Sequence, residues 1–173
     1  FCIAVPSNEG RCTECHTGYG YMDKTFDFGD MKNVDCLVCH DQSGTYVKGL
    51  TTGGQPDPAV DLSVVARSVA ENGGVPTIAN CIGCHAKAGG GDNFKRGDIE
   101  EAHRNPSPSF DVHMAAQADG GAGLSCLDCH TAVQHKIAGR GSDLRPRELQ
   151  EEVSCDRCHG ETPHDSRDID KHT

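Results

Sequence analysis

The chain has 173 residues, a formal net charge of −10 and only 35% hydrophobic residues. This acidic balance argues against a nucleic-acid-binding protein, since phosphate binding needs a basic surface. No apolar stretch is long enough to span a membrane, and the length fits one domain, residues 1–173. With 21 glycines and no tryptophan, the chain by itself can build only a poor apolar core.

Three helices are predicted between long stretches of loop. The first covers residues 62–72, where apolar residues recur at helical spacing after Asp61 and before a glycine pair. The second covers residues 99–104, behind Asp98 as its cap. The third covers residues 146–153 and begins with a proline. No clear strand pattern is present, so the predicted fold class is mostly α plus irregular coil, with little or no β.

The pattern Cys-x-x-Cys-His occurs five times, and this pattern attaches c-type haem. Structural zinc also uses paired cysteines, but it needs four protein ligands, and an odd number of pairs fits it poorly. A two-residue spacing also suits redox or metal chemistry better than a disulfide framework. The sequence therefore predicts five covalently attached haem c groups. The motif residues are Cys12, Cys15, His16, Cys36, Cys39, His40, Cys81, Cys84, His85, Cys126, Cys129, His130, Cys155, Cys158 and His159.

Five haems would supply the apolar surface that the side chains lack, so we expect a haem-dominated core. Each motif should sit on a short helical turn of its own. The chain without haem should not fold. Because haem of this type is attached outside the bacterial cytoplasm, the expected location is periplasmic or extracellular.

Five histidines lie outside the motifs, one for each iron, so every haem could have two histidine ligands. Such closed, low-potential haems suit electron transfer. His103 lies in a charged segment, where a solvated side chain is the stronger interpretation, and its role is left open. The candidate sixth ligands are His113, His135, His164 and His172.

A glycine-rich loop at residues 88–98 carries Lys95 and Arg96. One interpretation is a surface loop with solvated cations. The other is a loop that closes over a haem face, where glycines permit close approach and the cations hold an oxyanion or place a lysine amine on the iron.

Several segments in and around the motifs have a distinctive sequence: Arg11 to Tyr21 (RCTECHTGYGY), Asn33 to Asp41 (NVDCLVCHD), Gly44 to Tyr46 (GTY), the loop with Lys95, Asp111 to Met114 (DVHM) and His135 to Arg140 (HKIAGR). Together they resemble the octahaem tetrathionate reductase family of multihaem c-type cytochromes. The chain has fewer motifs than an octahaem protein, so it resembles an internal five-haem portion.

The resemblance implies a periplasmic protein in which one haem is catalytic and the others conduct electrons. The catalytic haem would be the one attached through Cys12 and Cys15, with Lys95 as a ligand to its iron. Arg96 would attract an anion, and Cys2 would lie near the active-site pocket.

Two functions stay open at this point. The first is an oxidoreductase in anaerobic respiration that reduces a sulfur or nitrogen oxyanion such as tetrathionate, nitrite or hydroxylamine. The second is a non-catalytic conduit with bis-histidine haems, either a soluble carrier or a polymerised extracellular filament built from copies of the chain. In both, other cytochromes are the redox partners.

Overall fold

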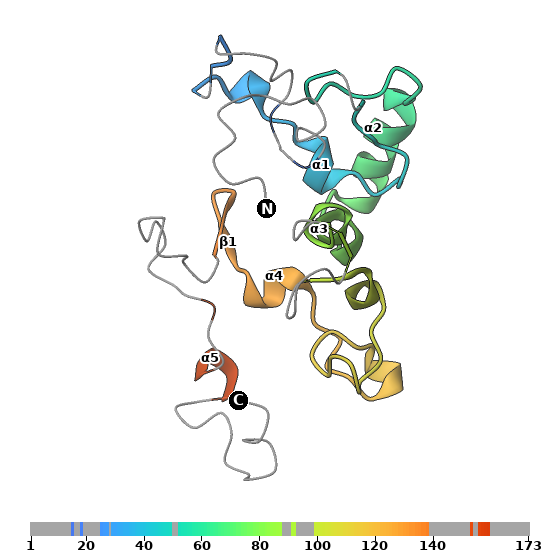
Figure 1. The fold of residues 1–173 in the computed structure, drawn as a ribbon, viewed down its shortest axis with the longest axis vertical. Coiled ribbons are helices and arrows are strands. Elements are labelled where there is room, and N and C mark those ends of the chain that lie inside the picture. The colour runs from blue at the N-terminus through green and yellow to red at the C-terminus, as the bar shows by residue number, and fades with distance from the viewer. Residues whose placement is uncertain are drawn as a thin grey trace. The chain divides into compact units, whose positions relative to one another are not determined.

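The computed structural model describes residues 15, 18, 25–27, 29–49, 52–87, 91–92, 99–138, 153 and 156–159. The chain divides into two compact units, Phe1–Gly123 and Leu124–Thr173. Short helices joined by coil make up most of the described chain (Figure 1), so the predicted fold class is confirmed. The elements are η2 (Met31–Asn33), α1 (Leu37–His40), α2 (Leu62–Asn72), α3 (Ile78–His85), η3 (Glu101–Arg104), η4 (Gln117–Asp119), α4 (Cys126–Cys129), β1 (Ala132–Val133), β2 (Lys136–Ile137) and α5 (Asp156–His159).

The longest described helix, α2, has the bounds that the sequence predicts. The Asp61 carboxylate accepts the Ser63 N–H at 2.9 Å, which satisfies one of the free amides at the start of the helix. Gly73 ends it in the left-handed conformation, at φ 73°. Val65 is the residue of this helix that is buried.

The helix predicted at residues 99–104 is shorter than expected. It is the single 3-10 turn η3, and its N-cap is Glu100. The cause is the short distance to Pro106, which disfavours helical backbone at Asn105, and Asn105 has φ −150° and ψ 70°. The predicted Asp98 cap and the predicted helix at residues 146–153 lie outside the described part of the chain, apart from residue 153.

Helical turns carry the described Cys-x-x-Cys-His motifs, as predicted: α1, α3, α4 and α5 each hold part or all of one. Among these four helices, α3 extends furthest ahead of its motif. Thr77 and Asn80 form a capping box there: the Thr77 N–H and hydroxyl both donate to the Asn80 Oδ1 atom, at 2.9 and 2.8 Å.

Leu124–Thr173 contains a hairpin in which β1 and β2 pair antiparallel, with Ala132 opposite Ile137. Its two-residue turn consists of Gln134 and His135, at φ 51° and 64°. Such turns favour glycine or asparagine because the left-handed region is costly for other residues. Two non-glycine residues in a row here mark a strained turn.

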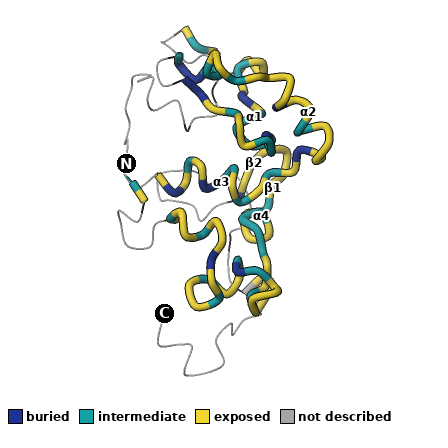
Figure 2. The backbone as a smooth tube through the Cα atoms, turned by 90° about the vertical axis from the view of Figure 1, so that its right-hand side faces the viewer, coloured by how far each residue is buried: buried dark blue, intermediate teal, exposed yellow. Residues whose placement is uncertain are grey.

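Few apolar side chains are buried in the described part of the chain. Among the described residues the buried hydrophobic ones are Val65, Ile82, Ala86, Ala115 and Ala138. Figure 2 shows how much of the described backbone is exposed or half-buried. The exposed large apolar side chains are Met31, Val34, Val47, Leu62, Val64, Val75, Ile99, Phe110, Val112, Val133 and Ile137. No helix in the described ranges is both long and apolar enough to cross a bilayer.

Candidate haem-binding sites

The structure describes three of the five motifs in full, at residues 36–40, 81–85 and 126–130, together with Cys15, Cys158 and His159 of the other two. The remaining predicted site residues lie outside the described residues: Cys2, Cys12, His16, Lys95, Arg96, Cys155, His164 and His172.

In each complete motif the helical backbone brings the histidine one turn after the first cysteine. The His40 N–H donates to the Cys36 carbonyl oxygen at 3.0 Å, and the His130 N–H donates to the Cys126 carbonyl oxygen at 2.8 Å. Residues three and four apart lie on one face of a helix, so the two thiols and the ring can reach one planar group. This local arrangement fits attachment of haem at adjacent thiols with the histidine on its iron.

Two motif histidines have the hydrogen bond that an iron ligand needs. The His40 Nδ1 atom lies 2.5 Å from the carbonyl oxygen of Gly74, and the His130 Nδ1 atom lies 2.8 Å from that of Ala138. Because a carbonyl oxygen can only accept, each Nδ1 carries a proton in this arrangement, and in the neutral ring Nε2 then has a lone pair. That tautomer is the one that binds a metal through Nε2, and the bond fixes the ring direction. These residues therefore fit haem.

The two thiols of the second motif differ in exposure: Cys36 is exposed and Cys39 is partly buried. Cys39 is half-buried, and burial raises the pKa of its thiol, with a further rise from the Asp35 carboxylate and from Cys36, while Lys48 lowers it. Cys36 and Cys39 form no disulfide. Both sulfurs are thus available for the thioether bonds that the motif makes, after which neither has a proton to lose.

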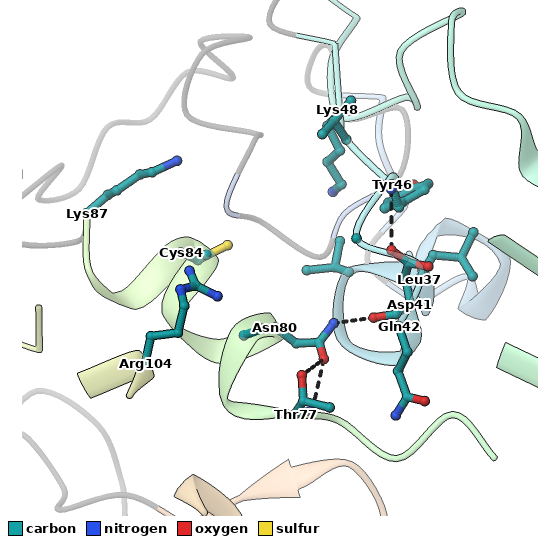
Figure 3. A pocket seen from close by; sticks show the side chains of 15 residues that line it. Leu37, Asp41, Gln42, Tyr46, Lys48, Thr77, Asn80, Cys84, Lys87 and Arg104 are labelled. Atoms are coloured by element: carbon teal, nitrogen blue, oxygen red, sulfur yellow. Dashed lines mark hydrogen bonds between the residues drawn. The ribbon is translucent and has the colours of Figure 1, made fainter. Parts of the chain in front are cut away.

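A pocket of about 410 Å³ opens between α1 and α3, within Phe1–Gly123. Figure 3 shows Cys84, Lys87 and Arg104 along one side of it, and Leu37, Asp41, Tyr46 and Lys48 along the other. Its walls thus combine a haem-attachment thiol, apolar side chains and basic groups. An amphipathic porphyrin with carboxylate substituents suits such walls, so part of the haem attached through Cys81 and Cys84 would fit there.

The basic residue Arg104 adds a positive charge to the lining of the pocket. Its guanidinium hydrogen-bonds the Glu101 carboxylate, one turn earlier in η3. That bond lowers the pKa of Glu101 and raises the pKa of Arg104. Both side chains are exposed, so solvent screens the pair, and its main effect is to orient Arg104.

A side-chain bridge joins the second and third motifs. The Asn80 Nδ2 group, on α3, donates to the Asp41 carbonyl oxygen at 2.6 Å, directly after His40. Gln42 also donates from its amide to the Val75 carbonyl oxygen. Asp41 itself is buried, and its carboxylate accepts the N–H and hydroxyl groups of Ser43, at 2.9 and 2.6 Å. The bonds from Asn80 and Gln42 hold the segments of the two motifs against each other, whereas those of Ser43 are local.

The candidate sixth ligands that the structure describes differ in setting. The His113 side chain is 56% exposed, with Nδ1 at 3.9 Å from the Asp111 carboxylate. His135 is exposed at the strained hairpin turn. His103 is half-buried and packs edge-on against Phe110, with ring centroids 4.8 Å apart.

The His103 ring bonds the start of its own helix. Its Nδ1 atom lies 3.1 Å from both the backbone nitrogen and the carbonyl oxygen of Glu100, so it accepts from the first or donates to the second according to its tautomer. The side chain thereby caps η3.

Several residues of these sites are not evident in the sequence pattern. The carbonyls of Gly74 and Ala138 are backbone groups, and no motif marks them. From the sequence, Asn80 would be interpreted as a helix-capping residue and not as one that links two haem motifs. Asp35 and Tyr46 lie inside the segments that carry the family resemblance, which is a signal that could have indicated them.

Comparison with known proteins agrees with this site. A family model described as cytochrome c554 and c-prime matches residues 80–160. A protein of Archaeoglobus fulgidus described as uncharacterized is 31% identical over 155 residues, covering 79% of this chain and 49% of its own length. The crystal structure of octahaem cytochrome c from Shewanella oneidensis matches with a TM-score of 0.77 and 39% identity, over 100% of this chain and 36% of that one. The chain thus spans about half the length of the curated relative. The likeness to octahaem cytochromes that the sequence predicts is confirmed.

Proposed function

Because the chain is a multihaem c-type cytochrome related to the octahaem cytochromes c, we propose that it conducts electrons within a reductase of sulfur or nitrogen oxyanions. The observation that carries this proposal is that the likeness to an octahaem cytochrome runs over the whole chain, including segments outside the haem motifs. The substrate class is tetrathionate, nitrite or hydroxylamine, by the family resemblance.

Electron transfer is the part of this function that the family supports directly. When bound, haem c supplies one-electron redox chemistry. The chain's own contribution is to hold its ligands still. The Gly74 and Ala138 carbonyls fix the rings of His40 and His130, and Asn80 keeps the second and third motifs at a constant separation. In the proposal each of the five motifs holds one haem, and residues 1–173 work as a single domain.

The catalytic part of the proposal concerns residues outside those that the structure describes. The haem attached through Cys12 and Cys15, with His16 on its iron, is the substrate-reducing one. Lys95 would hold the opposite side of that iron or leave it to admit substrate. Arg96 would attract the oxyanion against the acidic field of the chain, and Cys2 would border the pocket.

The other irons take histidine on both sides. In the proposal the sixth ligands are His113, His135, His164 and His172. The strained turn favours His135, since a left-handed conformation in a non-glycine residue is often retained where it positions a functional side chain.

Location and partners follow from the cofactor chemistry. Haem c is attached outside the bacterial cytoplasm, so the proposed place is the periplasm or the extracellular space, and the proposed process is anaerobic respiration. Other cytochromes would deliver the electrons. Their contact surface is expected to be basic, because the chain has a net charge of −10.

For the test, the haem-loaded protein is first reduced chemically. Tetrathionate, nitrite or hydroxylamine is then added, and reoxidation of the haems is followed by their visible absorption bands. The Lys95→Leu variant should lose reoxidation by substrate while its other haem spectra persist. Arg67→Leu, at an exposed arginine of α2, also replaces a positive charge by leucine and should keep full activity.

Unchanged turnover in Lys95→Leu would refute the catalytic assignment. A wild-type protein that exchanges electrons with another cytochrome and reduces none of the three compounds would instead favour the conduit. Electron micrographs that show filaments at high concentration would identify the polymerised form of that conduit.

A further inference from the structure

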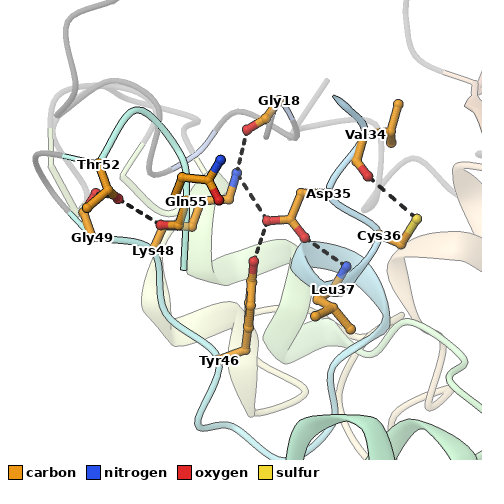
Figure 4. A network of polar contacts seen from close by, with 10 residues as sticks. All are labelled: Gly18, Val34, Asp35, Cys36, Leu37, Tyr46, Lys48, Gly49, Thr52 and Gln55. Carbon is orange, nitrogen blue, oxygen red and sulfur yellow. Dashed lines mark hydrogen bonds and ion pairs between the residues drawn. The ribbon is translucent and has the colours of Figure 1, made fainter. Parts of the chain in front are cut away.

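A buried ion pair lies beside the second haem motif. The Lys48 Nζ atom is 3.4 Å from the Asp35 Oδ2 atom, and each side chain is only 2% exposed. Figure 4 shows the pair and its neighbours. Moving both charges out of water costs free energy that their attraction often fails to recover. Because so few side chains are buried among the residues that the structure describes, such a pair calls for a reason other than stability.

The Asp35 carboxylate is held by donors on both oxygens. The Tyr46 hydroxyl donates to Oδ2 at 2.5 Å, and the Leu37 N–H donates to Oδ1 at 3.0 Å. Leu37 is the first residue of α1, so the carboxylate caps the helix that carries Cys39 and His40. Asp35 also directly precedes Cys36. The negative charge therefore lies at the N-terminus of a helix that carries haem-attachment residues.

The Lys48 ammonium reaches a second haem-bearing segment. Its Nζ atom donates to the Gly18 carbonyl oxygen at 3.1 Å, three residues beyond Cys15. The strand-like bridge between Gly18 and Val34 brings the same two segments together. Lys48 also lines the pocket that contains Cys84. The pair thus lies where parts of the chain from three motifs converge.

Charges buried at such a place act strongly on a redox centre, because the low dielectric constant screens them little. Reduction of a haem iron adds one negative charge. A nearby carboxylate opposes that charge and lowers the reduction potential, whereas a nearby ammonium favours it and raises the potential. Paired, the two charges largely cancel.

We propose that Asp35 and Lys48 form a balanced electrostatic pair, in which each buried charge offsets the effect of the other on the reduction potential of the haem attached through Cys36 and Cys39. Asp35 and Lys48 act on the haem through their electric field and contact neither iron nor substrate, so they are positioning residues. This inference rests on haem attachment alone, and failure of the reductase proposal would leave it unaffected.

The test is a redox titration of the haem-loaded protein, with electron paramagnetic resonance to separate the haems. Asp35→Asn keeps the acceptor for the Leu37 N–H, places an amide NH2 group against the Tyr46 hydroxyl and removes the negative charge, so one haem should shift to higher potential. Lys48→Met removes the positive charge and should shift the same haem to lower potential. The double variant should return close to the wild-type value. Lys32→Met is the matched control at an exposed lysine of η2 and should move that haem less than Lys48→Met does.

A purely structural role predicts a different pattern. Loss of packing would open the site to water in both Asp35→Asn and Lys48→Met, and the reduction potential would shift in the same direction in the two variants. Alternatively, stability would fall with no change in the potential. Either result would overturn the proposal. Where Asp35→Asn yields no haem-loaded protein, Lys48→Arg decides. If Lys48→Arg keeps the wild-type reduction potential and Lys48→Met lowers it, a charge effect is supported. Equal shifts of the potential in the two variants would overturn the proposal.

Discussion

The Nδ1 atom of His40 hydrogen-bonds the carbonyl oxygen of Gly74 at 2.5 Å, across 34 residues of sequence. Gly74 follows the residue that ends α2, and its φ of 62° lies in the left-handed region. The end of one helix thereby fixes the ring of a haem ligand on another. The direction of that ring, and with it the orientation of the iron ligand, depends on a glycine that no haem motif contains.

Gly74→Ala should therefore disturb one haem, and Gly73→Ala should not. Both glycines have positive φ, so either alanine costs about 1 kcal/mol of stability. At Gly74 the added Cβ would also meet Val69 Cγ1 at 3.0 Å and His40 Nδ1 at 3.8 Å, whereas at Gly73 nothing lies within 4 Å. The measurements are denaturant unfolding and the electron paramagnetic resonance spectrum. Identical spectra for the two variants would contradict the role of the Gly74 carbonyl.

Asn80→Ala should weaken the joint between α1 and α3. It removes the donor to the Asp41 carbonyl and the acceptor for Thr77, and loss of part-buried hydrogen bonds costs about 1–3 kcal/mol. Asn72→Ala is the matched control, because the Asn72 side chain bonds only exposed groups of Ser68 within its own helix among the contacts described here. We expect the control to change the free energy of unfolding by less than about 0.5 kcal/mol. Equal losses in denaturant unfolding would argue against the joint.

Lys87→Glu tests the assignment of the pocket to a haem. Lys87 lines the pocket beside Cys84, so a carboxylate there should repel the haem propionates and shift the potential of that haem downward. Arg67→Glu adds a similar charge at an exposed position of α2 that does not line the pocket and should shift it much less. Redox titration measures both variants. Shifts of the same size would show that the pocket is not where that haem binds.

The hairpin turn allows strain and iron ligation to be separated. Gln134→Gly should relieve a left-handed residue and stabilise the protein by about 1 kcal/mol with no change in the haem spectra. His135→Gly relieves the same kind of strain but removes the proposed ligand, so one low-spin haem should become high-spin. Spectra of His135→Gly that match the wild type would exclude His135 as a ligand.

Without haem the chain should not fold cooperatively. Val65 and Ile82 are the largest fully buried side chains of the described residues, and within that part of the chain so small a core cannot offset the conformational entropy lost on folding. Protein produced without the haem-attachment machinery should give no near-ultraviolet circular dichroism and no cooperative melt. A sharp thermal transition in that material would show that the protein core suffices.

The sequence by itself determined those features that neighbouring residues decide. The haem chemistry follows from the Cys-x-x-Cys-His spacing, because one helical turn suffices to bring thiols and ring together. The bounds of α2 follow from Asp61 and Gly73, since caps act within a few residues. The helix predicted at residues 99–104 came out as the single turn η3, because the effect of the proline on Asn105 outweighed the helical pattern.

The tertiary structure decided which distant groups complete each site. Gly74 and Ala138 supply carbonyls to His40 and His130 because folding brings those backbones within reach, and no side-chain pattern encodes a carbonyl's position. The burial of Asp35 with Lys48 likewise depends on segments packed around them rather than on either residue's neighbours in sequence. Local hydrogen bonds are set by spacing along the chain, whereas burial and dielectric environment are properties of the packed chain as a whole.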